Sequence, residues 1–243
     1  MRGILTSLGR LLSFFGEMVL VVKNIFLYHR EIKDAFFEFS LGSLPLILIV
    51  SIFVGFSTAA SALYIALPGT PPYLIGSGIF KGIILEIEPV LLGLLLVGRI
   101  GAGVASELGS MKVSEQIEAL RALGISPSGF LVLPRVLASL LASPLLLVIG
   151  YWVALLSAYL LASPRISGFE FLRGIRLFFE GKEISVGIVK ALIFGFIASF
   201  FGSFFGLVPK EGAGGVGYWT MVSVVTGSLF ILFANYLVNI LIL

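Results

Sequence analysis

Long stretches without a charged side chain constrain the fold of this protein more than any other feature. Residues 39–80 carry no charge, and neither do residues 136–164. Each stretch exceeds the ~20 residues that an α-helix needs to cross the hydrocarbon core of a bilayer. The chain is 58% hydrophobic and 12% charged, about half the charged fraction usual in soluble domains. The sequence therefore predicts an all-α integral membrane protein forming a single transmembrane domain over residues 1–243.

Five membrane spans follow from the apolar runs and the residues that interrupt them. We expect the spans at residues 44–67, 79–108, 136–162, 191–209 and 218–243. Pro68, Gly69, Pro71 and Pro72 end the first span, because proline breaks the backbone hydrogen bonding of a helix and glycine favours turns. No internal repeat is visible.

The second predicted span, residues 79–108, contains ionisable residues within its apolar run. Glu86, Glu88 and Arg99 lie there, and Pro89 is expected to kink the helix. Charged groups at membrane depth are costly, so each needs a polar partner or a functional role. On one straight helix Glu88 and Arg99 would lie ~16 Å apart, too far for a direct pair. Contact with a substrate head group and a structural ion pair between spans both stay open.

Two further helices are expected outside the spans. Residues 1–35 have apolar residues at spacings of three and four, which predicts an amphipathic helix lying in the membrane interface. A buried bundle helix is the alternative for this segment. Residues 165–180 mix arginine and glutamate with phenylalanine and leucine, which predicts a helical loop on the outer side.

The distribution of lysine and arginine predicts the orientation. Ten such residues lie in segments 1–43, 99–135 and 209–217, and five lie in segments 68–83 and 163–184. Because cytoplasmic segments carry the excess of basic residues, we expect a cytoplasmic N-terminus.

Several classes of function are excluded by missing residue types. The chain has no cysteine, and His29 is its one histidine, so thiolate metal sites, disulfides and cysteine-based catalysis are excluded. It also lacks the Gly-x-x-x-x-Gly-Lys-Ser/Thr motif that cradles ATP phosphates. We expect no catalytic residues, no metal site, no nucleic-acid partner and no ATPase site in this chain.

Small residues four apart mark residues 98–109. The pairs include Gly98/Ala102, Gly101/Ala105 and Ala105/Gly109, and this spacing lets helices approach closely in lipid. Glu107 and Arg99 flank this small-residue face at the cytoplasmic end of the second span.

A short amphipathic helix is predicted at residues 114–124. Ser114 is the expected N-cap, Glu115 suits the first turn, and Gly124 suits the residue after the C-cap. Ile117 and Leu120 share an apolar face, while the charged face comprises Glu115, Glu118 and Arg121. The pattern fits a loop helix packed on the bundle and a docking helix for a soluble partner equally well.

The run from Gly98 through Glu107, Lys112 and Gln116 to Pro127 closely resembles the signature of the MlaE family. These proteins are permease subunits of ABC transporters that move phospholipids and related lipids. Glu86 and Pro89 match the family's Glu-x-x-Pro element. Its glycine-rich turn between the last two spans is matched by Gly212, Gly215 and Gly217.

The resemblance implies a homodimer in the bacterial inner membrane. Two ATPase subunits would bind ATP and magnesium, and an MCE-domain protein would relay the lipid outside. It implies a lipid cavity, for which our candidate residues are Arg99, Glu86, Glu88 and Pro89. It also implies an ATPase-coupling segment, for which the candidates are Glu107, Lys112, Ser114, Glu115, Gln116, Ile117, Glu118, Leu120 and Arg121.

The sequence departs from the family in its last span. Thr220 stands where the family has two threonines beside basic residues, and Asn235 replaces a common acidic residue. A secondary transporter or channel for an amphipathic solute, using the intramembrane Glu and Arg residues, is the alternative function. Such a transporter usually has related halves, and none are visible here.

Overall fold

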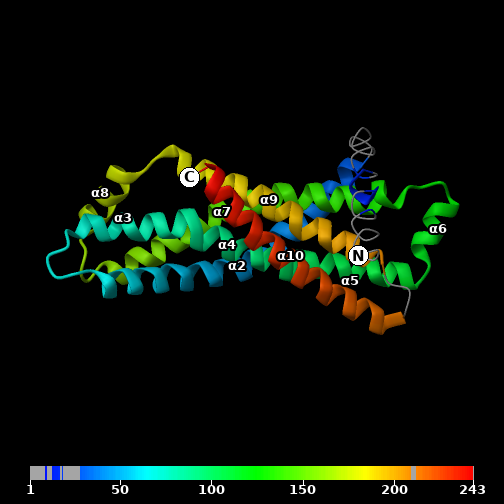
Figure 1. Ribbon diagram of the computed structural model, residues 1–243, viewed down its shortest axis with the longest axis horizontal. Helices are drawn as coiled ribbons and strands as arrows, with labels where there is room; N and C mark the ends of the chain where they lie inside the picture. The colour runs from blue at the N-terminus through cyan, green and yellow to red at the C-terminus, as the bar shows by residue number, and fades with distance from the viewer. Residues whose placement is uncertain (1–8, 10–12, 17, 19–27, 209–211, 243) are drawn as a thin grey trace.

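The computed structural model describes residues 9, 13–16, 18, 28–208 and 212–242 (Figure 1). These residues form helices and turns and contain no strand. Most of the predicted interfacial helix at residues 1–35 lies outside the described residues. Its last part, residues 29–35, belongs to a longer helix.

Four helices in this part of the chain are long and apolar enough to cross a membrane. They are α2 (His29–Ile65), α7 (Leu133–Ala162), α9 (Gly181–Gly206) and α10 (Gly212–Ile242). Helix α2 packs along α7, and α9 packs against both α7 and α10 (Figure 1). The predicted all-α membrane protein is confirmed.

Two of these helices begin well before the predicted spans. Helix α2 starts at His29 instead of residue 44, and α9 starts at Gly181 instead of residue 191. Hydropathy detects only the apolar part of a helix, so charged residues at its start are missed. In α9 the charged residues before residue 191 are Lys182, Glu183 and Lys190, of which Lys190 is fully buried.

The second predicted span is helical but irregular. The chain runs through α3 (Pro72–Gly82), η2 (Ile83–Ile87), α4 (Glu88–Leu96), η3 (Val97–Gly101) and α5 (Ala102–Val113). The segments η2 and η3 are five-residue π-helices, and such turns are common at functional sites. Pro89, the expected kink, is the second residue of α4, and Glu88 separates it from the end of η2.

The two ends of the bundle carry different short helices (Figure 1). One end holds α6 (Gln116–Ala122). The other holds α3 and α8 (Gly168–Phe178), which falls within the loop predicted to be helical. Gly174 has no room for a Cβ atom against the Tyr73 carbonyl, so α3 and α8 pack backbone to backbone. Helix α6, within the predicted inner segment 99–135, therefore lies at the opposite end from α3 and α8, which fall in the predicted outer segments 68–83 and 163–184.

Small residues bring α9 close to η3 and α5, in the second predicted span, as their spacing predicted. A Cβ atom added at Gly202 would lie 2.6 Å from the Gly101 carbonyl oxygen, and one at Gly206 would lie 3.0 Å from Ala105 Cα. Gly98, by contrast, has no such neighbour within 4 Å. Gly101 and Ala105 therefore form the close contact, and Gly98 does not.

The glycine-rich turn predicted at residues 212–217 is narrower than expected. Gly212 has a φ of 45°, but Gly215 and Gly217 lie inside α10. The prediction is wrong for these two glycines, because a helix tolerates glycine when neighbouring apolar residues extend it.

We predict that Gly202→Ala destabilises the bundle by about 1–3 kcal/mol, because the added methyl group meets backbone that cannot move alone. Gly98→Ala is the matched control, since its Cβ atom points into open space. Thermal unfolding of the detergent-solubilised protein measures both. Equal unfolding midpoints for the two variants would contradict the proposed close packing.

Candidate functional site

The irregular segment η2 leaves two backbone carbonyls without their regular α-helical donors. The Glu88 N–H donates to the Ile83 carbonyl, five residues back, and Pro89 has no N–H to donate. The carbonyls of Ile84 and Leu85 therefore need other partners, because unsatisfied backbone groups are costly in a membrane.

Neighbouring helices supply both partners. The Tyr151 hydroxyl of α7 donates to the Ile84 carbonyl at 2.7 Å. Lys190 Nζ of α9 donates to the Leu85 carbonyl at 2.6 Å. The π-helical segment is thus held between α7 and α9 by two side-chain hydrogen bonds.

Glu86 is the centre of a polar cluster on the side of η2 that faces α9 and α10. Lys190 Nζ lies 3.2 Å from Glu86 Oε2 and forms an ion pair with it. Asn235 Nδ2 donates to Glu86 Oε1 at 2.6 Å, and Asn239 Nδ2 donates to Oε2 at 2.8 Å. The structural ion pair considered for Glu86 is therefore present, and Asn235 adds an amide donor to it.

Glu88 faces the opposite side, toward α2 and α7. Its Oε1 accepts a 2.5 Å hydrogen bond from the Ser51 hydroxyl, and it lies so close to Gly150 that no side chain fits there. Glu88 is only 2% exposed, and its Oε2 has no hydrogen-bond partner among the described residues. Glu88 is thus enclosed between three helices and presents no surface to a ligand.

Arg99 lies in η3 and is exposed beside α2. Its guanidinium lies close to Gly42, where an added Cβ atom would be 3.0 Å away. Within the part of the chain that the structure describes, it forms no salt bridge. Arg99 is therefore exposed and outside any ion pair among the described residues, and its contact with a head group stays a prediction.

The predicted head-group residues do not meet at one point. Glu86 faces α9 and α10, Glu88 and Pro89 are buried, and Arg99 is exposed. Lys190 and Tyr151, which complete the site, were not among the residues predicted from the sequence. One sequence feature points to the need for such a partner. A proline in a helix has no N–H for the carbonyl four residues before it, and for Pro89 that carbonyl belongs to Leu85.

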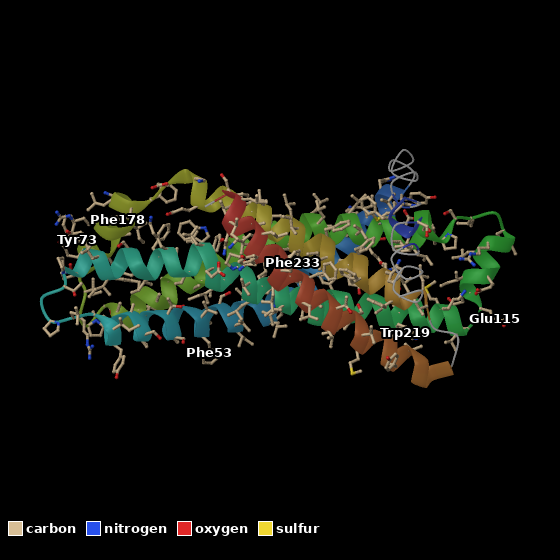
Figure 2. All side chains as sticks on the ribbon, viewed as in Figure 1. Phe53, Tyr73, Glu115, Phe178, Trp219 and Phe233 are labelled. Atoms are coloured by element: carbon tan, nitrogen blue, oxygen red, sulfur yellow. The ribbon has the colours of Figure 1, made fainter. Side chains whose placement is uncertain are left out.

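A cavity of about 410 Å³ opens between α2 on one side and η2 and α4 on the other. Its walls are mostly apolar, and hydroxyl groups come from Ser57, Thr58 and Ser61 of α2. Phe53, which also lines the cavity, projects from the outer side of α2 (Figure 2). Sequence analysis did not find this cavity, although hydroxyl residues within a charge-free helix are a usable signal.

The short helix predicted at residues 114–124 is present as α6, with a different N-terminus. Ser114 ends α5, and Glu115, with a φ of 60°, precedes α6. The predicted N-cap at Ser114 is therefore wrong, because its hydroxyl donates to the Ser110 carbonyl of α5 instead. Gly124 ends the helix as predicted, with a φ of 76°. Ile125 N–H donates to the Leu120 carbonyl at 3.0 Å, which completes a Schellman motif.

The orientation of α6 leaves one side exposed. Ile117 is buried and Leu120 is half-buried, as their shared apolar face predicted. Leu123 is 75% exposed, and Glu115, Gln116 and Arg121 are also exposed. The exposed side of α6 and its C-cap thus presents Leu123 together with charged and amide side chains.

Two ion pairs connect the helices near α6: one joins α5 to α6, and the other joins α5 to α7. Lys112 of α5 pairs with Glu118 of α6, and this hydrogen bond holds the pKa of the Glu118 carboxyl below its ordinary value. Arg135 binds Glu107 through two nitrogens, at 2.6 and 3.3 Å. Arg135 was not among the residues predicted from the sequence to belong to this region. Lys112, Glu118 and Glu107 therefore anchor α6 and α5 within this chain.

We predict an energetic coupling between Glu86 and Lys190. Glu86→Gln leaves the buried ammonium without its counter-ion, which should cost about 3 kcal/mol. Lys190→Gln added to it removes the unpaired charge and keeps an amide donor, so the double variant should be more stable than Glu86→Gln alone. Thermal unfolding in detergent over the double-mutant cycle measures the coupling. Strictly additive losses would show that the pair is not coupled.

Comparison with known proteins gives the family of this fold and site. The family model "Permease MlaE" matches residues 33–241. A probable ABC transporter permease of Rickettsia typhi is 38% identical over 156 residues, covering 63% of this chain and 60% of that protein. A probable ABC transporter permease of Synechocystis is 34% identical over 156 residues, covering 63% of this chain and 59% of that protein.

A chloroplast protein is also similar. The protein trigalactosyldiacylglycerol 1 of Arabidopsis thaliana is 34% identical over 161 residues, covering 63% of this chain and 45% of that protein. The chain thus spans about three fifths of the length of the bacterial relatives it matches. Because the family model covers nearly all of α2 to α10, which carry both the π-helical site and α6, this chain belongs to the MlaE permease family.

Proposed function

We propose that this chain is the membrane-spanning subunit of an ATP-driven transporter that moves phospholipid. Its relatives in Rickettsia and Synechocystis are named probable ABC transporter permeases, and the sequence holds no ATP-binding loop of its own. Separate ATPase subunits would then bind ATP and magnesium. The observation that carries the proposal is α6, an exposed helix that connects α5 to the segment leading into α7 and pairs with α5 through Lys112 and Glu118.

Helix α6 is built to transmit force from a partner. The Lys112–Glu118 pair ties it to α5, and Ile117 is buried beneath it. Helix α5 continues without a break into η3, which carries Arg99. A push on α6 would therefore reach Arg99 through one continuous helical segment, whose π turns offer sites for a local change in helical packing.

A lipid cargo fits the cavity between α2 and the second segment. Its apolar walls suit acyl chains, and Ser57, Thr58 and Ser61 offer hydrogen bonds to a head group. Arg99 does not line this cavity: it lies beside Gly42, which precedes Ser57 by ~22 Å along α2. Its exposed guanidinium offers two parallel N–H donors to a phosphate at that separate position. The Arabidopsis relative is named after trigalactosyldiacylglycerol, a glycerolipid, which supports a lipid as cargo.

The remaining partners follow from the same proposal. A second copy of this chain would face the cavity and close it, giving a homodimer with one ATPase on each α6. The α6 end would be cytoplasmic, with the N-terminus on the same side, in agreement with the excess of lysine and arginine in those segments. An MCE-domain protein would receive lipid at the opposite end, beside α3 and α8.

We predict that Leu123→Lys reduces the lipid-stimulated ATPase activity of the assembled complex at least ten-fold. The charge would enter an apolar contact with the ATPase and cost about 2 kcal/mol. Leu67→Lys is the matched control, because Leu67 is 76% exposed in the turn at the opposite end. Wild-type activity in Leu123→Lys would contradict docking through α6.

We also predict that Arg99→Gln lowers the phospholipid recovered with the purified complex several-fold, because the phosphate loses its charged donor. Lys182→Gln, which removes an exposed charge at the start of α9, should leave the recovery unchanged. Mass spectrometry of extracted lipids measures both. Unchanged lipid in Arg99→Gln would remove Arg99 from the head-group site.

A further inference from the structure

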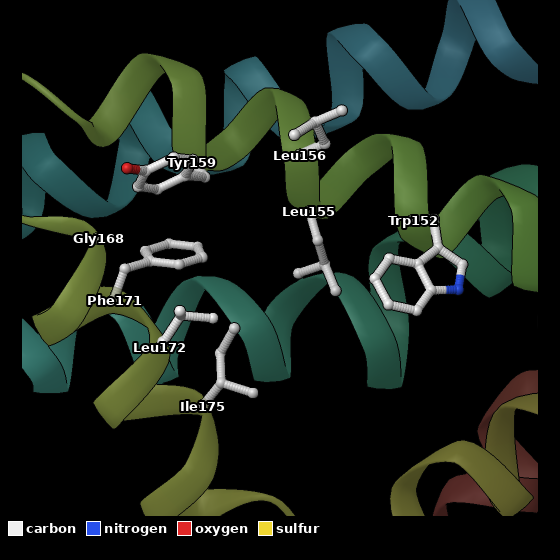
Figure 3. Close-up of a pocket in the computed structure, with 8 residues that line it drawn as sticks. All are labelled: Trp152, Leu155, Leu156, Tyr159, Gly168, Phe171, Leu172 and Ile175. Carbon is white, nitrogen blue, oxygen red and sulfur yellow. The ribbon is translucent and has the colours of Figure 1, made fainter.

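A second cavity, of about 310 Å³, lies between α7 and α8, away from the proposed cargo cavity on α2. Figure 3 shows its two walls. Helix α7 contributes one wall and α8 the other, with the cavity lined by Trp152, Leu155 and Tyr159 on the first side and by Phe171, Leu172 and Ile175 on the second. We call this cavity the α7–α8 groove.

The groove suits a hydrocarbon chain. All of its lining residues are apolar or aromatic apart from one glycine, and Tyr159 packs on Phe171 at 5.5 Å between ring centroids at one end. Trp152, at the other end, is 74% exposed (Figure 3). Because α7 crosses the membrane, the medium around this exposed wall is lipid. Tyr159 and Trp152 are seven residues apart, which is ~10 Å along the helix.

Two arginines without ion pairs among the described residues lie beside the groove, Arg165 beyond the Tyr159 end and Arg176 next to the α8 wall. Arg165 is in the turn that joins α7 to α8, and Arg176 follows Ile175 directly. Both are exposed, and neither forms a salt bridge within the described ranges. Arg173 differs, because it pairs with Glu170 at 3.4 Å and lies over the Tyr73 ring.

Helix α8 itself has the character of an interfacial helix. Phe169, Leu172 and Leu177 are exposed on it, and Arg176 is exposed among them. A helix that presents apolar and basic side chains together lies at the boundary of head groups and acyl chains. The groove therefore runs from the head-group level at α8 into the hydrocarbon along α7.

We propose that the α7–α8 groove binds an anionic phospholipid of the surrounding bilayer. One acyl chain lies between Tyr159 and Trp152, and the phosphate contacts Arg165 and Arg176. Two unpaired guanidinium groups favour a head group with net negative charge over a zwitterionic one. The bound lipid fills the gap between α7 and α8 and thereby holds α8 in place. This inference needs only the membrane location and is independent of the transported cargo.

Trp152 reports on this lipid directly. The chain has two tryptophans, so Trp219→Phe leaves Trp152 as the single indole fluorophore. The full chain is placed in bilayers that contain phosphatidylglycerol or phosphatidylcholine brominated on the acyl chain, and quenching is measured against mole fraction. We expect the brominated phosphatidylglycerol to reach half-maximal quenching at a mole fraction at least five-fold lower than the phosphatidylcholine.

The head-group preference should depend on the two unpaired arginines. Each basic side chain near a membrane surface gives about a five-fold preference for anionic lipid, so Arg165→Gln with Arg176→Gln should abolish the preference. Arg173→Gln, compared with the single variant Arg176→Gln, removes one charge from the same helix but from a paired position, and it should retain the preference.

Three results would overturn the proposal. Equal quenching by the two lipids would show ordinary contact with the bilayer. A preference that survives in the double variant, or is lost equally in Arg173→Gln, would show a general charge effect. Absence of quenching by either lipid would show that protein covers the groove. Because the experiment uses the chain without ATPase subunits or ATP, its outcome does not depend on the proposed transport function.

Discussion

The buried ammonium of Lys190 holds the most irregular part of the membrane domain together. Pro89 deprives the Leu85 carbonyl of its donor, and Lys190 replaces that donor while pairing with Glu86. Tyr151 does the same for Ile84 from α7. Lipid offers no water to satisfy these groups. The π-helical turn can therefore persist only while α7 and α9 stay packed against it.

The same packing connects the two ends of the protein. Gly202 and Gly206 bring α9 into backbone contact with η3 and α5, so the segment that leads from α6 to Arg99 is enclosed along one side. Its other side is open, since Arg99 and the cavity on α2 face the surroundings. The segment from α5 to η3 is therefore packed against α9 on one side and exposed at Arg99 on the other.

Local sequence signals predicted what depends on neighbouring residues along the chain. Charge-free runs predicted the membrane helices. Pro68, Pro71 and Pro72 predicted the break after α2, and Gly124 predicted the end of α6. The boundaries were less accurate: α9 extends past Lys190, because a hydropathy pattern cannot show that a distant carboxylate and carbonyl will satisfy the charge. Ser114 failed as an N-cap because its hydroxyl found a carbonyl in the preceding helix.

The sequence by itself determined that this chain is an all-helical membrane protein of the MlaE type with no ATP-binding loop. It also marked Glu86, Glu88 and Arg99 as residues that need an explanation. Only the tertiary structure decided that Glu86 pairs with Lys190, that Glu88 is enclosed by α2 and α7, and that Arg99 stays exposed. The reason is physical: the energy of an ionisable group in lipid depends on partners from other helices, and sequence spacing within one helix does not reveal them.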